Sequence, residues 1–156
     1  QPDFSLNFNT SVAWKNFDVS LYFNSVVGND IYNNLANVID NLSMFSKGSN
    51  TTVHATQTNE AFNNVLDYSN RYIEDGSYLR LSSATLGYTV PLKNKRYISN
   101  LRFTLTGNNL FVITGYSGYD PEVNSNRTSN GVPALGIGWT NYPMARSYSL
   151  GVSIDF

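Results

Sequence analysis

Apolar and polar residues alternate with a period of two along most of this 156-residue chain, and this pattern restricts its fold more than any other feature. Successive side chains of a β-strand point to opposite faces of a sheet, so the alternation is typical of strands with one apolar and one polar face. It predicts an all-β fold with five strands, at about 4–14, 17–27, 77–90, 100–113 and 145–156. The last range is the clearest, because serine, glycine and aspartate alternate there with Tyr148, Leu150, Val152, Ile154 and Phe156.

The connections between these ranges alternate between short and long. Lys15–Asn16 is a tight turn and 91–99 is a short link, whereas 28–76 and 114–144 are long. Loops of that length are uncommon inside a compact soluble domain, but transmembrane β-barrels have short turns at one end and long loops at the other. Twelve residues rising about 3.3 Å each, tilted near 45°, cross about 28 Å, which matches the apolar band of such a barrel. The sequence therefore predicts an antiparallel transmembrane β-barrel, with a soluble carbohydrate-binding β-sandwich as an alternative.

Composition excludes several classes of function. Lys plus Arg is 10 and Asp plus Glu is 11, so the chain offers no basic surface for nucleic acid. The absence of cysteine excludes a thiolate metal site and a cysteine nucleophile, and the single histidine, His54, excludes any site that needs two imidazoles. Phosphate-binding loops and nucleophile motifs are also missing from the sequence. We therefore expect neither an enzyme nor a cofactor.

The first long connection contains a helical pattern. Apolar residues recur at helical spacing, and Asn29 or Asp30 could cap the helix. The apolar residues are Ile31, Leu35, Val38, Ile39 and Leu42. A second short helix is predicted near Glu60–Tyr68, after an exposed polar tract at 46–58.

The second long connection holds two candidate binding sites. Tyr116, Tyr119, Trp139 and Tyr142 could stack on sugar rings, although packing of the loop on itself is the interpretation we favour. Oxygen-bearing side chains that could ligate calcium alternate at Asp120, Glu122, Asn124 and Asn126. Their spacing differs from that of a calcium-binding loop, so we predict a turn ordered by aspartate hydrogen bonds and no metal.

Four motifs, together with the opening hairpin at Pro2–Phe4, carry a resemblance to a known family. They are Tyr72–Leu81 (YIEDGSYLRL) with Thr85–Pro91 (TLGYTVP), Leu105–Phe111 (LTGNNLF), Tyr116–Val123 (YSGYDPEV) and the closing stretch from Pro143 to Phe156. In this order they resemble the C-terminal barrel region of SusC/RagA-type TonB-linked outer-membrane proteins of Bacteroidetes. The resemblance covers essentially the whole chain. It implies the last five strands of a barrel of about 22 strands, with the plug and N-terminal parts absent from this chain.

The resemblance also implies a function. Members of the family import oligosaccharides, or in some cases peptides, through the cell outer membrane, with a SusD-like surface lipoprotein above the barrel and TonB supplying energy to its N-terminal part. A passive porin or structural barrel would have similar strands and remains an alternative. The family's C-terminus lies in the periplasm, which would place 28–76 and 114–144 outside the cell. Barrels of this kind end on an aromatic residue that the assembly machinery reads, a role that would fall to Phe156 together with Ile154, Val152, Leu150 and Tyr148.

The barrel hypothesis makes two predictions about side chains. The apolar set from Leu150 to Phe156 should face lipid, with Ser149, Gly151, Ser153 and Asp155 toward the lumen. Arg102 begins the fourth strand and Asp155 ends the fifth, and both fall on the polar face. If these strands are antiparallel neighbours, the two side chains should form an ion pair.

Overall fold

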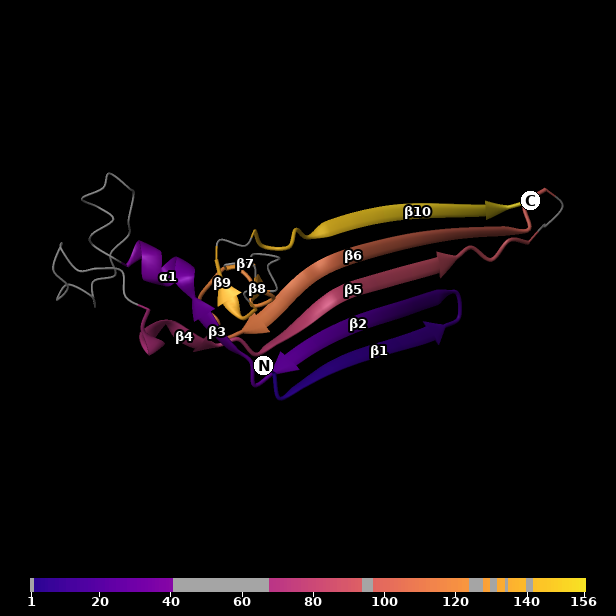
Figure 1. Ribbon diagram of the computed structural model, residues 1–156. Helices are drawn as coiled ribbons and strands as arrows, with labels where there is room; N and C mark the ends of the chain where they lie inside the picture. The colour runs from indigo at the N-terminus through magenta and orange to yellow at the C-terminus, as the bar shows by residue number, and fades with distance from the viewer. Residues whose placement is uncertain are drawn as a thin grey trace. The chain divides into compact units, whose positions relative to one another are not determined.

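The computed structural model describes residues 2–40, 68–93, 97–123, 128–129, 132–133, 135–139 and 142–156 (Figure 1). The chain divides into two compact units. The sheet unit comprises Phe4–Val26, Tyr78–Ile113 and Met144–Phe156, and the loop unit comprises Gln1–Asp3, Val27–Ser77 and Thr114–Pro143. In the described part of the chain, no helix is long and apolar enough to cross a membrane.

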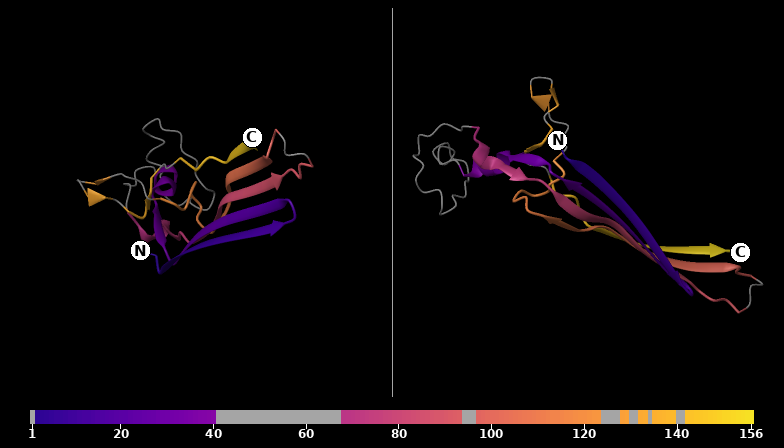
Figure 2. Two further views of the ribbon diagram at one scale, coloured as in Figure 1. Left: turned by 90° about the vertical axis from the view of Figure 1, so that its right-hand side faces the viewer. Right: turned by 90° about the horizontal axis from the view of Figure 1, so that it is seen from below.

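Five long strands form the sheet unit. They are β1 (Phe4–Trp14), β2 (Phe17–Val27), β5 (Tyr78–Thr89), β6 (Asn100–Thr114) and β10 (Ser147–Asp155), in the order β1-β2-β5-β6-β10. Figures 1 and 2 show them side by side in one curved layer, with the β1–β2 turn and the end of β10 at the same end. The predicted antiparallel all-β architecture is confirmed, and the strands begin and end within two residues of the ranges expected from the alternation.

Pairing of the strands separates the sheet into an apolar and a polar face. On the apolar face, Leu150 of β10 lies opposite Leu105 of β6, and Val19 of β2 lies opposite Leu86 of β5. The residues that alternate with these apolar residues along each strand are mainly serine, threonine and glycine, and they lie on the opposite face. Every residue of β10 is exposed. A sheet whose apolar residues remain exposed is not the core of a soluble sandwich, because such a core buries them.

The backbones of β2 and β6 each depart from regular strand geometry at one described position. Between Tyr22 and Phe23 the pairing of β2 with β5 shifts, which is the mark of a β-bulge. In β6, Asn109 has a φ of +52°, a left-handed conformation that asparagine tolerates better than most residues. A β-bulge such as the one at Tyr22–Phe23 bends a strand and increases its twist, as a curved sheet requires.

The loop unit contains short elements. They are β3 (Asp30–Asn33), α1 (Asn34–Ile39), the 3-10 helix η2 (Asn70–Tyr72), β4 (Ile73–Asp75), β7 (Thr128–Ser129), β8 (Val132–Pro133) and β9 (Ile137–Gly138). β3 lies between β4, which is antiparallel to it, and β9, which is parallel. Ile31, Tyr116 and Val123 form a buried cluster and are the apolar core of this unit.

The helix predicted from Ile31 onward is wrong at its start. Residues 30–33 form β3, and the N-cap is Asn33, whose side chain accepts a hydrogen bond from the Ala36 amide at 3.0 Å. Ile31 fits helical spacing, but it is fully buried in β3, since pairing with β4 and β9 surrounds it. Leu42, the polar tract at 46–58 and residues 60–67 of the second predicted helix lie outside the described residues.

Candidate functional site

A network of hydrogen bonds centred on Glu74 organises the loop unit. Asn33 Nδ2 donates to Glu74 Oε1 at 2.8 Å and to Ser117 Oγ at 3.0 Å. Ser117 in turn donates to both carboxylate oxygens, from its hydroxyl at 2.8 Å and from its amide at 2.7 Å. Since the Asn33 side chain also caps α1, one residue that is only 2% exposed joins β3, β4, α1 and the turn at 115–118. The network fixes the position of residues 116–119, where two of the predicted site residues lie.

Tyr116 belongs to the interior of this unit. Its side chain is buried, and burial raises the pKa of its hydroxyl to about 12, with the nearby Glu74 carboxylate as the second cause. Two glycines make room for the ring: a Cβ at Gly138 would lie 2.1 Å from the Tyr116 Oη, and one at Gly118 would lie 2.4 Å from Cε1. Tyr116 therefore contributes to packing of the loop rather than to an open surface.

The structure brings three of the four predicted aromatic residues together. Tyr116, Tyr119 and Trp139 line a hollow of about 10 Å³, which is room for a single water molecule. Tyr119 is 66% exposed and Tyr142, which precedes β10, is 91% exposed. A hollow of this size cannot take a sugar ring, and among the four residues Tyr119 and Tyr142 have the most exposed rings for stacking.

The acidic stretch after Gly118 forms a turn. Asp120 Oδ1 accepts a hydrogen bond from the Glu122 amide at 2.9 Å, which is an aspartate turn of the predicted kind. Within the described residues, no group of three or more acidic, histidine or cysteine side chains could hold a metal ion. Asn124, Asn126 and His54 lie outside the described residues.

A larger cavity beside β3 was not predicted from the sequence. It has a volume of about 440 Å³ and is lined by Pro2, Asn29, Asp30, Tyr32, Ile73 and residues 135–137. The ring of Tyr32 packs against those of Tyr68 and Tyr72, at centroid distances of 5.9 and 6.4 Å. The lining combines an aromatic and apolar wall with amide and carboxylate oxygens, a mixture suited to a small polar organic molecule. Its parts are far apart in the sequence. The antiparallel pairing of β3 with β4 brings Ile73 to Tyr32, and the parallel pairing of β3 with β9 brings Ile137 to the same residue.

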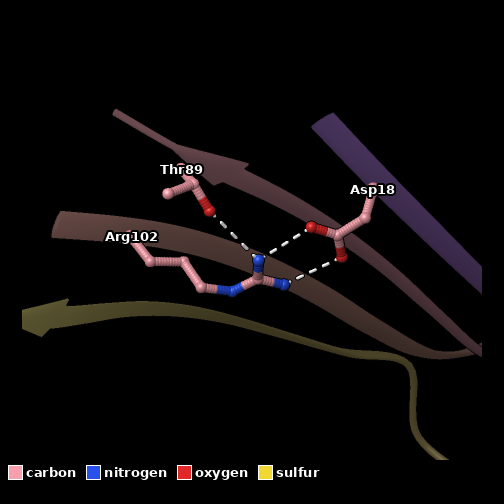
Figure 3. Close-up of polar contacts among 3 residues, drawn as sticks. All are labelled: Asp18, Thr89 and Arg102. Atoms are coloured by element: carbon pink, nitrogen blue, oxygen red, sulfur yellow. Dashed lines mark hydrogen bonds and ion pairs between the residues drawn. The ribbon is translucent and has the colours of Figure 1, made fainter. Parts of the chain in front are cut away.

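On the polar face of the sheet unit, an ion pair crosses three strands. Arg102 Nη1 and Nη2 donate to Asp18 Oδ1 and Oδ2, each at 2.8 Å, and Nη1 also lies 3.4 Å from Thr89 Oγ1 (Figure 3). The predicted pair of Arg102 with Asp155 is therefore wrong. The register places Ser153 opposite Arg102, and Asp155 accepts instead from Asn100 Nδ2 at 3.0 Å. Arg102 reaches Asp18 on the far side of β5 because Gly87, which lies between them, has no side chain.

Gly87 allows a direct test of this ion pair. A Cβ there would lie 2.3 Å from Arg102 Nη2 and 2.5 Å from Asp18 Oδ1, so Gly87→Ala must displace both groups. Because the side chains of Arg102 and Asp18 are 35% and 30% exposed, water screens the pair and we expect only a small decrease in the free energy of unfolding. The same substitution in an Asp18→Asn background should cost less, since the pair is already broken. Gly151→Ala on the same face is the control, because its nearest neighbour would lie 3.8 Å away. Equal effects in both backgrounds would contradict the proposed coupling.

The predicted assembly residues lie on the exposed apolar face of β10 and just after it. Leu150 is 76% exposed, Phe156 is 92% exposed, and Tyr148, Val152 and Ile154 are also exposed. The partners of Leu150, Val152 and Ile154 on β6 are Leu105, Phe103 and Leu101, so the apolar face continues across both strands.

Curated proteins similar to this chain are named TonB-dependent receptors. The chain is 31% identical to the TonB-dependent receptor P3 of Formosa agariphila and 30% identical to the TonB-dependent receptor SusC of Bacteroides thetaiotaomicron, in each case over 99% of this chain. It spans only about a sixth of the length of these relatives, at 16% and 15%. No family model matches the chain.

Solved structures show the same fold. The RagAB peptide transporter superposes with a TM-score of 0.71 at 21% sequence identity, covering 99% of this chain and 17% of that one. The RagAB peptide importer in its open-open state gives 0.70 at 22% identity. The sheet is thus one portion of a larger barrel. Together with the sequence motifs, these likenesses show that the chain is similar over its whole length to part of the barrel of SusC/RagA-type TonB-dependent receptors.

Proposed function

We propose that this chain forms part of the wall of an energised nutrient importer in the outer membrane of a Gram-negative cell. The observation that carries the proposal is the continuous, exposed apolar face of a five-stranded antiparallel sheet whose other face is polar. In a closed barrel the apolar face meets lipid and the polar face lines the lumen. The relatives named TonB-dependent receptors support import rather than passive diffusion through a porin.

The strand directions support one orientation. Both long connections leave the sheet at the ends of β2 and β6 and return at the starts of β5 and β10, so they lie at the same end of these antiparallel strands. We place that end outside the cell, and the Lys15–Asn16 turn and 91–99 in the periplasm. The loop unit is then the part of this chain that arriving nutrient meets first.

The substrate in this proposal is an oligosaccharide or a peptide. Tyr119 and Tyr142 offer exposed rings, and the cavity beside β3 offers a mixed aromatic and polar lining. Tyr116 and Trp139 support these groups from within the loop unit. The proposed partners are the rest of the barrel with its plug, a SusD-like lipoprotein above the loops, and TonB, acting on a part of the protein outside this chain. Phe156 and the apolar residues before it would be read during assembly of the barrel.

The orientation and the role of the loops can be tested in one experiment. In a cysteine-free version of the complete protein, Tyr142→Cys should react with an impermeant biotin-maleimide on intact cells, since Tyr142 is 91% exposed. Bound streptavidin should then lower uptake of oligosaccharide or peptide. Collapse of the proton-motive force should abolish uptake, whereas diffusion through a porin would continue without it. Lys93→Cys is the control and should react only after permeabilisation. Reaction of Lys93→Cys on intact cells, with none at Tyr142→Cys, would show that the orientation is reversed.

A further inference from the structure

The apolar face of the sheet is not evenly filled. A hollow of about 200 Å³ lies in it, and Ala84 and Gly107 contribute the two smallest residues of its lining. Larger side chains surround it, among them Leu86, Leu105, Leu110 and Tyr148. An apolar cavity of about 150 Å³ can hold a benzene ring. This hollow is therefore large enough for a length of hydrocarbon chain.

A cation lies on the same face, near one end of the sheet. Lys15 has a φ of +56° in the β1–β2 turn, and its Nζ lies 4.6 Å from the centre of the Trp14 ring. Trp14 is 66% exposed, and because it lies six residues after Phe8 in β1, the two side chains share one face of the strand. The Phe8 ring lies 6.5 Å from that of Phe23 in β2. The contact with Trp14 therefore holds the ammonium on the apolar side of the turn instead of the polar side.

Aromatic rings lie between the cation and the hollow. Phe17 and Tyr88 are opposite each other in β2 and β5, with ring centroids 4.6 Å apart. The next pair along the same face, Val19 with Leu86, already lines the hollow. Val19 lies two residues beyond Phe17, about 7 Å along β2 at 3.3 Å per residue, and Lys15 lies in the turn just before β2. One leaflet of a hydrocarbon core is about 15 Å thick, so an acyl chain with its headgroup at Lys15 reaches the hollow.

We propose that this face binds one diacyl glycerophospholipid. The Lys15 ammonium pairs with the phosphodiester, and an acyl chain runs over the Phe17–Tyr88 pair into the hollow at Ala84 and Gly107. The charges match, since one ammonium faces one phosphodiester anion, and the aromatic rings occupy the interfacial depth at which tyrosine and tryptophan accumulate. The inference rests on the proposed placement of the apolar face in a membrane.

Native mass spectrometry of the complete protein in detergent tests this site. Titration with palmitoyl-oleoyl phosphatidylglycerol should give one tightly retained lipid for the wild type. Lys15→Gln should lower its occupancy about fivefold, the effect of one lysine near an anionic surface, and Lys15→Arg should retain it. Ala84→Phe, which fills the hollow, should also lower occupancy, whereas Leu6→Phe on the apolar face of β1 and Lys93→Gln should leave it unchanged.

The outcomes separate this inference from the proposed function. Equal occupancy in wild type, Lys15→Gln and Ala84→Phe would overturn the lipid site, and so would retention of lipopolysaccharide or of a second protein in place of the phospholipid. Fractionation of the wild-type protein with the outer membrane is measured in parallel. If the protein is found elsewhere, the proposed function fails, whereas loss of the lipid difference alone leaves it standing.

Discussion

Leu150→Arg should lower the free energy of unfolding of the complete barrel by about 2–4 kcal/mol. Leu150 lies near the middle of β10, is 76% exposed, and stands opposite Leu105 on the apolar face. In a membrane, a guanidinium at this depth would be surrounded by hydrocarbon. Ser149→Arg is the matched control: it is adjacent in sequence but on the polar face, so we expect a change within about 0.5 kcal/mol.

Depth provides a second control for this prediction. Ile154 is on the same face but close to the end of β10, where the cost of a charge falls to about 0–1 kcal/mol. Urea unfolding in lipid vesicles, followed by the heat-modifiable shift on a gel, measures Leu150→Arg, Ser149→Arg and Ile154→Arg. Similar losses for Leu150→Arg and Ser149→Arg would show that the apolar face does not meet lipid.

The second large effect is expected at Asn33 in the loop unit. Asn33→Ala removes the cap of α1 and leaves the Glu74 carboxylate without one of its donors. Loss of a cap costs about 0.5–2 kcal/mol and loss of a hydrogen bond to a charged group about 1.5–3 kcal/mol, so local opening should become easier by about 2–5 kcal/mol. The measurement is hydrogen exchange at the amides of Ala36 and Ser117 in the complete protein.

Asn37 supplies the control for this substitution. It is as buried as Asn33, at 2% exposure, but its side chain makes one described hydrogen bond, from Nδ2 to the Tyr32 hydroxyl at 2.7 Å. Asn37→Ala should therefore cost about 1 kcal/mol. Asn33→Asp keeps an acceptor for the cap but sets a second carboxylate against Glu74, so exchange at Ser117 should rise more than exchange at Ala36. Equal exchange in Asn33→Ala and Asn37→Ala would show that the network around Glu74 does not hold the loop.

The long strands were predictable from the sequence because each has one polar and one apolar face, which makes the alternation of Leu150 with Ser149 visible without a structure. The secondary structure around Ile31 could not be predicted in this way. Its spacing suits a helix and a strand equally, and the choice is made by β4 and β9, which come from distant parts of the chain. The partner of Arg102 was unpredictable for a related reason. It depends on which strands flank β6 and on the absence of a side chain at Gly87, and neither follows from local pattern.

Some features of the candidate site were predictable from the sequence, and others depend on contacts between distant parts of the chain. Tyr119 and Tyr142 are exposed, as residues of a long loop are expected to be, whereas Tyr116 is buried because Gly118 and Gly138 admit its ring. The role of Gly138 could not be predicted, since it follows from the pairing of β9 with β3. The cavity beside β3 depends on that same pairing.

The strand order also sets a sequence of folding events. β1 and β2 are joined by two residues, so this hairpin can form within microseconds. β2 and β5 pair across the whole of 28–77, and closing so long a loop is slow because its entropy is lost before any contact forms. In the folded chain the two ends of this connection are joined, since the Gly76 amide donates to the Asn29 carbonyl at 2.6 Å and the Gly28 amide to Ser77 Oγ at 3.0 Å. We therefore expect contact between residues 28–29 and 76–77 to accompany the pairing of the β1–β2 hairpin with the β5–β6 hairpin, the step that joins the two hairpins into one sheet.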